Sequence, residues 1–90
     1  MKATDKISDK LIKDFSPITL EVKDESYLHA GHAGAPKGGE SHFHVKMVSA
    51  IFEGQSRVQR QKMVHQSLKE DLATYIHALS LELKTPSEAE

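Results

Sequence analysis

The sequence contains no cysteine and no tryptophan, and neither sign of charge dominates it. Without cysteine, the chain acting alone has no disulfide, no thiolate nucleophile and no all-cysteine metal or cluster site. Twelve basic and 13 acidic residues give a formal charge of −1, which excludes the broad basic surface of a non-specific nucleic-acid binder. No apolar run approaches the roughly 18 residues that a membrane span needs, and no signal-peptide pattern is visible. We therefore expect a cytoplasmic protein that does not associate with membranes.

What is present is an ordinary globular composition with a surplus of histidine. Hydrophobic residues make up 38% of the chain and charged residues 28%, and six of the 90 residues are histidines. This composition is too apolar for a disordered chain, and the length allows one modest core. We expect a single domain over residues 1–90, with its core in about 4–86 and a frayed tail at 87–90.

Two amphipathic helices are indicated by the spacing of apolar residues. The first is expected over residues 4–15, with Thr4 as N-cap and Pro17 enforcing its end. Its apolar stripe consists of Ile7, Leu11 and Phe15. The second helix begins at a capping-box pattern, Ser56–Gln59, after a turn that includes Phe52 and Gly54. Its stripe consists of Val64, Leu68, Leu72 and Tyr75, with Met63 beside it.

Three strands are indicated by apolar residues that alternate with polar ones. In the first strand the apolar residues are Ile18, Leu20 and Val22; in the second, Phe43, Val45 and Met47; in the third, over residues 77–84, Leu79, Leu81 and Leu83. A glycine-rich segment at 29–40 separates the first two strands, so we expect an antiparallel hairpin with a long tip. The order α-β-β-α-β predicts an α+β fold, in which two helices cover one face of a three-stranded sheet.

This order, combined with several short strings, resembles the BolA family. The strings are Asp24-Glu25-Ser26, Glu40-Ser41-His42-Phe43, Val48-Ser49, Phe52-x-Gly54, Arg60, Leu68 and His77-Ala78-Leu79. One departure is visible, because the family often has Arg-His where this chain has Arg60-Gln61. The resemblance implies a KH-like fold of type II and no enzymatic activity of its own. In agreement, the sequence has no P-loop, nucleophile elbow or HExxH motif.

The resemblance also implies a partner and a cofactor. BolA-like proteins pair with monothiol glutaredoxins, in iron–sulfur cluster trafficking or iron regulation. The pair shares a [2Fe–2S] cluster, held by the glutaredoxin cysteine, glutathione and two BolA side chains. Those side chains are a histidine at the start of the last strand, here His77, and a histidine or cysteine from the loop between the first two strands, here His29 or His32. A ligand gains from a rigid base, which favours His29, but both residues stay open.

Two other functions are compatible with the sequence. Some bacterial members of the family are described as transcriptional regulators that bind DNA, and Arg57, Arg60 and Lys62 would supply phosphate contacts on the second helix. An ordinary solvated helix face also explains these residues, and the overall charge of −1 favours that interpretation. The third alternative is a stress-response interaction domain whose loop binds a protein without metal.

The remaining expectations concern His42, His44 and the oligomeric state. His42 and His44 share one strand face, where they either bind a divalent metal weakly or line the solvent side of the sheet. Nothing in the sequence requires a dimer, so we expect a monomer in the apo state.

Overall fold

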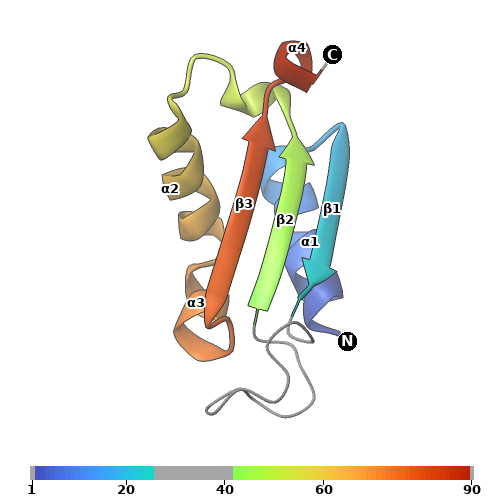
Figure 1. Ribbon diagram of the computed structural model, residues 1–90, viewed down its shortest axis with the longest axis vertical. Helices are drawn as coiled ribbons and strands as arrows, with labels where there is room; N and C mark the ends of the chain where they lie inside the picture. The colour runs from blue at the N-terminus through green and yellow to red at the C-terminus, as the bar shows by residue number, and fades with distance from the viewer. Residues whose placement is uncertain (1, 26–41, 90) are drawn as a thin grey trace.

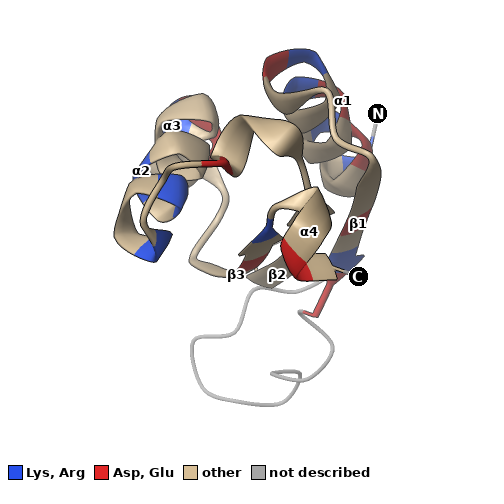
Figure 2. Ribbon diagram, turned by 90° about the horizontal axis from the view of Figure 1, so that it is seen from above, with Lys and Arg blue, Asp and Glu red and all other residues tan. Residues whose placement is uncertain are grey.

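A computed structural model of the chain describes residues 2–25 and 42–89, which form a helical layer packed on a three-stranded sheet (Figure 1). The elements follow in the order α1 (Ala3–Phe15), β1 (Thr19–Asp24), β2 (His42–Val48), the 3₁₀ turn η2 (Ala50–Phe52), α2 (Arg57–Ser67), α3 (Lys69–Thr74), β3 (Ala78–Lys84) and α4 (Pro86–Ala89). Figure 2 shows α1, α2 and α3 on the same side of the sheet. The predicted α+β class and the one-sided helical cover are confirmed.

The strands lie in the order β1-β2-β3, with β1 antiparallel and β3 parallel to β2. The antiparallel pair confirms the predicted hairpin. The parallel pair follows from the α2–α3 crossover, because a helical connection returns the chain to the same end of the sheet. As a result, the residues that open β2 and β3 lie side by side, with His42 paired with Ala78. No helix in the described ranges is long and apolar enough to cross a membrane.

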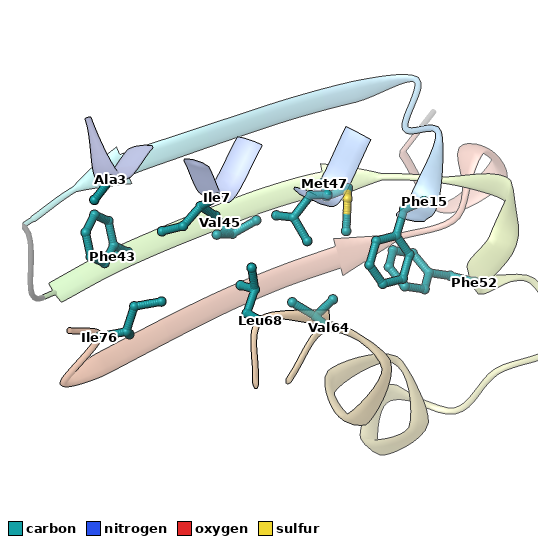
Figure 3. Close-up of a cluster of buried hydrophobic side chains, with 11 residues drawn as sticks. Ala3, Ile7, Phe15, Phe43, Val45, Met47, Phe52, Val64, Leu68 and Ile76 are labelled. Atoms are coloured by element: carbon teal, nitrogen blue, oxygen red, sulfur yellow. The ribbon is translucent and has the colours of Figure 1, made fainter. Parts of the chain in front are cut away.

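The core lies between the sheet and the helices (Figure 3). Its buried members are Ala3, Ile7, Leu11, Phe15, Phe43, Val45, Met47, Phe52, Val64, Leu68 and Ile76. The predicted stripe of the first helix and the inward face of the second strand are therefore confirmed. Ile18 is an exception: it precedes β1, and 65% of it is exposed.

The ends of the helices differ in detail from the sequence expectations. Lys2 occupies the N-cap of α1, while Thr4 lies inside the helix and accepts a hydrogen bond at its carbonyl from Ser8 Oγ. At α2 the cap is as expected, because Ser56 Oγ accepts from the backbone N–H of Gln59 at 3.1 Å. The second helix is divided at Leu68, so the predicted single helix is two shorter ones, α2 and α3.

The expected frayed tail is instead the short helix α4 at Pro86–Ala89. Thr85 and Glu88 cap it reciprocally: Glu88 Oε1 accepts from the Thr85 N–H at 2.9 Å, and Thr85 Oγ1 accepts from the Glu88 N–H at 3.3 Å. Arg60 on α2 donates to both carboxylate oxygens of Glu88, at 2.6 and 3.0 Å. A capping box with proline at the first helical position favours a helix here, and the ion pair holds it against α2.

Glu88 should make folding stability depend on pH. The hydrogen bond from Arg60, together with that from the Thr85 backbone, lowers the pKa of Glu88 from 4.5 to about 2. A carboxyl with a depressed pKa in the folded state stabilises the fold above its unfolded pKa, and this contribution is lost as the pH falls. We expect Glu88→Gln to be less stable than the parent protein at pH 7, and the difference to shrink between pH 4.5 and pH 2.

Urea denaturation at several pH values would measure this difference. Glu53→Gln is the matched control, because Glu53 is exposed and its carboxylate forms no ion pair with another described residue. A difference between Glu88→Gln and the parent that stays constant from pH 7 to pH 2 would contradict the assignment.

Candidate functional site

His77 lies at the start of β3, at the end of the sheet where the described chain breaks off after Glu25 and resumes at His42 (Figure 1). Its side chain is exposed, while the preceding Ile76 is buried in the core. The backbone N–H groups of Tyr75 and Ile76 both donate to the Asp71 carbonyl at 3.0 Å. The exposed imidazole of His77 thus follows directly on a fixed piece of backbone, as a binding residue requires.

Asp71 ties this backbone to α1. Its carboxylate accepts from Lys10 Nζ at 2.6 Å and from the Tyr75 hydroxyl at 2.7 Å. Burial raises the pKa of Asp71, but the hydrogen bonds from Lys10 and Tyr75 outweigh it, so the net pKa lies below the usual value. The charged Asp71 therefore connects the turn that precedes His77 to Lys10 on α1.

His42 is the nearest described histidine to His77. The two ring centroids are 6.3 Å apart, and the rings are nearly parallel, with 17° between their planes. The parallel pairing of β2 with β3 brings them together, because His42 lies opposite Ala78. The sequence paired His42 with His44 on one strand; the signal that was missed is the β-α-β order, which places the starts of two parallel strands at one end of the sheet.

His44 has a different partner. Its Nδ1 lies 3.0 Å from the hydroxyl oxygen of Ser80 on the neighbouring strand. No cluster of three or more metal-ligating side chains occurs within residues 2–25 and 42–89. His42 and His44 alternate with the buried Phe43 and Val45, so they face the side of the sheet opposite the helices, as one of the two sequence interpretations has it. Weak metal binding by the pair stays a prediction.

The loop candidates His29 and His32 lie outside the described residues. The described chain fixes where their segment begins and ends, since the Glu25 N–H donates to the His42 carbonyl at 2.7 Å. Both attachment points are at the end of the sheet that carries His77. The choice between His29 and His32 stays open.

Arg60 is not available for phosphate contact, which corrects one of the three residues proposed for nucleic acid. The residue is only 7% exposed, and its guanidinium donates to the Gln55 and Leu83 carbonyls as well as to Glu88. Burial of a guanidinium in this way is favourable only when its donors are satisfied, which they are here. Arg57 and Lys62, by contrast, are exposed on α2.

These observations define a class of protein: a small α+β domain that presents a pair of stacked histidines, His42 and the exposed His77, at one end of a three-stranded sheet, and a short basic face on α2. The comparisons give the family. A family model described as BolA-like protein matches residues 11–88, and the chain belongs to the BolA-like family.

Relatives and solved structures agree with this assignment. The chain is 48% identical over 87 residues to the Arabidopsis thaliana protein named BOLA1, chloroplastic, covering 93% of this chain and 54% of that protein. It is 42% identical over 90 residues to the Escherichia coli K12 protein named DNA-binding transcriptional regulator BolA, covering all of this chain and 82% of that one. The structure of BolA1 from Arabidopsis thaliana aligns with a TM-score of 0.87 at 40% identity, over 100% of this chain and 99% of that chain.

The chain spans between 24% and 57% of the length of the first curated relatives that it matches. Two of these relatives carry a chloroplast location in their names, so the expected cytoplasmic location of this chain stays a prediction. The Escherichia coli relative is named as a regulator and not as an enzyme. That this chain has no enzymatic activity of its own stays a prediction.

Proposed function

We propose that this chain is a BolA-type adaptor that pairs with a monothiol glutaredoxin and supplies histidine ligands to a shared [2Fe–2S] cluster, in iron–sulfur trafficking or iron regulation. The observation that carries the proposal is the exposed His77 on its fixed backbone, at the end of the sheet where the segment containing His29 and His32 is attached. Membership of the BolA-like family supports the proposal, because the glutaredoxin partner and the cluster were inferred from the resemblance to that family.

The chain offers histidine side chains and no cysteine, which fits a protein that supplies part of the ligand set of such a cluster. Imidazole can replace thiolate on cluster iron and raises the reduction potential, as in Rieske centres. His77 makes no hydrogen bond to another described residue, so its ring nitrogens are not committed to a structural role. Since the chain has no cysteine, the sulfur ligands must come from the glutaredoxin and glutathione.

Reconstitution of the chain with a monothiol glutaredoxin, glutathione, iron and sulfide tests the proposal. The reference is the glutaredoxin homodimer carrying its own cluster. We expect the visible absorption and circular dichroism to change when this chain is added and to settle at a one-to-one complex. An unchanged spectrum, with no complex on a sizing column, would refute it.

A second candidate function is DNA binding through α2. The Escherichia coli relative is named a DNA-binding transcriptional regulator, and Arg57 and Lys62 are exposed on the first two turns of α2. Because Arg60 is paired with Glu88, Arg57 and Lys62 are the two of the three predicted phosphate-contacting residues that are still available. Binding would depend chiefly on phosphate contacts and would therefore weaken with salt.

The expected result is that replacing Arg57 and Lys62 with alanine weakens binding to a 30-base-pair duplex and lowers the salt slope by about 0.9 for each contact removed. Fluorescence anisotropy at several salt concentrations measures both quantities. Lys13→Ala, an exposed change on α1, is the control and should leave the slope unaltered. Binding that is undetectable, or that does not vary with salt, would remove this second function.

A further inference from the structure

We propose that the outer edge of β3, beside α2, binds an extended acidic peptide segment as a fourth strand of the sheet. The pairing edge runs along β3 from Leu79 to Leu81, and the groove beside it lies towards the α4 end, whereas His77 precedes the strand (Figure 1). The inference is independent of the proposed cluster function, because it uses neither His77 nor the attachment points of the segment that holds His29 and His32.

The first step is the direction of the backbone groups of β3. In a parallel pair, alternate residues bond both their N–H and C=O to the neighbouring strand, and the residues between them face the opposite way. The Ser49 N–H donates to the Lys84 carbonyl at 3.0 Å, so Lys84 faces β2. Alternation then turns the backbone groups of Leu79, Leu81 and Leu83 outward.

An independent contact confirms this direction. Arg60 Nη1 reaches the Leu83 carbonyl from α2 at 3.3 Å, on the side away from β2. Among the described residues, β3 is the last strand of the sheet, and no hydrogen bond occupies the outward backbone groups of Leu79 and Leu81. A strand edge with free N–H and C=O groups, and without proline to blunt it, is a template for another strand.

The second step is the groove beside this edge. A cavity of about 460 Å³ lies between α2, the second half of β3 and α4. It is lined by Arg57, Arg60, Gln61, Leu81, Glu82, Leu83, Lys84 and Glu88. The lining combines the apolar Leu81 and Leu83 with charged residues of both signs. An extended peptide recognised by main-chain pairing also uses such contacts for its side chains.

The charges of the groove select the occupant. Glu88 is paired with Arg60, and Glu82 lies 3.5 Å from Lys46. Arg57 and Lys84 have no carboxylate partner within the described residues. The net unpaired charge is therefore positive, which is complementary to a peptide that carries aspartate or glutamate.

A second copy of this chain fits the edge less well than a peptide does. Pairing of two β3 edges would be isologous, so a two-fold axis would run between the two strands. Because α2 lies beside β3 on the helical side of the sheet (Figure 2), that axis would bring the two α2 helices towards each other. A single extended segment brings no helix with it.

The test uses a fluorescein-labelled eight-residue peptide of alternating valine and glutamate, with two backbone-methylated versions. One version carries N-methyl groups on the odd-numbered residues and the other on the even-numbered ones. Only one set of peptide N–H groups faces β3 in a strand pair, so one version should lose binding and the other keep it. We also expect amide hydrogen exchange of Leu79 and Leu81 to slow when the unmodified peptide is bound.

Charge variants test the choice of an acidic occupant. Arg57→Glu and Lys84→Glu should each weaken binding of the peptide by about tenfold, since each replaces attraction by repulsion at a residue that lines the groove. Lys69→Glu is the matched control, because Lys69 is exposed on α3 and does not line the groove. The control should bind the peptide as the parent protein does.

Several results would overturn the proposal. The first is that the protein does not bind the peptide at millimolar concentration. The second is that the two methylated peptides bind equally well or equally poorly. The third is that the protein without peptide sediments as a dimer that pairs through β3. Tighter binding of an eight-nucleotide single-stranded DNA at the same edge would assign the groove to nucleic acid instead. Failure of glutaredoxin reconstitution would leave the peptide result untouched, so the two proposals fail separately.

Discussion

Replacing His77 with alanine is expected to abolish the mixed cluster while leaving a folded protein that still associates with apo-glutaredoxin. The side chain is exposed and makes no hydrogen bond to a described residue, so its removal costs the fold little. The change does remove an imidazole from the iron. Loss of groups that merely support a metal ligand already costs 10–100-fold in affinity, so loss of the ligand itself should shorten the cluster lifetime by more than about tenfold.

The readout is the visible absorption and circular dichroism of the reconstituted complex, followed over time, with a sizing column to check association. His65→Ala is the matched control, because His65 is exposed on α2 and is not among the candidate ligands. An unchanged spectrum and lifetime in His77→Ala would show that the ligand assignment is wrong.

Three further histidine variants assign the second ligand. Of His29→Ala and His32→Ala, we expect one to reproduce the loss seen with His77→Ala and the other to behave as the control. His42→Ala should have an intermediate effect, since the His42 ring lies beside the His77 ring at 6.3 Å and supports its position. A complete loss in His42→Ala would make His42 the second ligand.

The sequence was sufficient for the parts of the fold that depend on local periodicity. The alternation in β2 and the four-residue spacing in α1 identified their buried faces, because each pattern repeats within a few residues. His77 was identified by its place before Ala78-Leu79 in a family string, and the structure shows that side chain exposed on a fixed turn.

Contacts between residues distant in sequence were not predictable in this way. Arg60 has the charge and spacing of a surface cation, and only its partners 23 and 28 residues later, Leu83 and Glu88, make it a buried structural residue. The same contact turns the expected frayed tail into α4. His42 and His77 are 35 positions apart in sequence, and only the parallel pairing of their strands brings the rings together.

Phe52 was assigned to a turn from the sequence, and its replacement with alanine is expected to be the most destabilising single change considered. Its side chain is fully buried, and its ring lies 5.4 Å from the ring of Phe15 at the end of α1. Truncation of a buried phenylalanine costs about 3–5 kcal/mol through lost burial and the cavity left behind. A 90-residue domain has a total stability of about 5–13 kcal/mol, so the variant would lose a large share of it.

Thermal unfolding followed by circular dichroism would measure the loss. At about 4–8 °C for each kcal/mol in a domain of this size, Phe52→Ala should lower the Tm by at least about 12 °C. Ile51→Ala is the matched control: the neighbouring side chain is 46% exposed, and its truncation should change stability by about 0.5 kcal/mol or less. Equal shifts in the two variants would mean that Phe52 is not a core residue. A large shift in Phe52→Ala alone would show that a short turn, and not only the helices and strands, carries part of the core that holds α1 against the sheet.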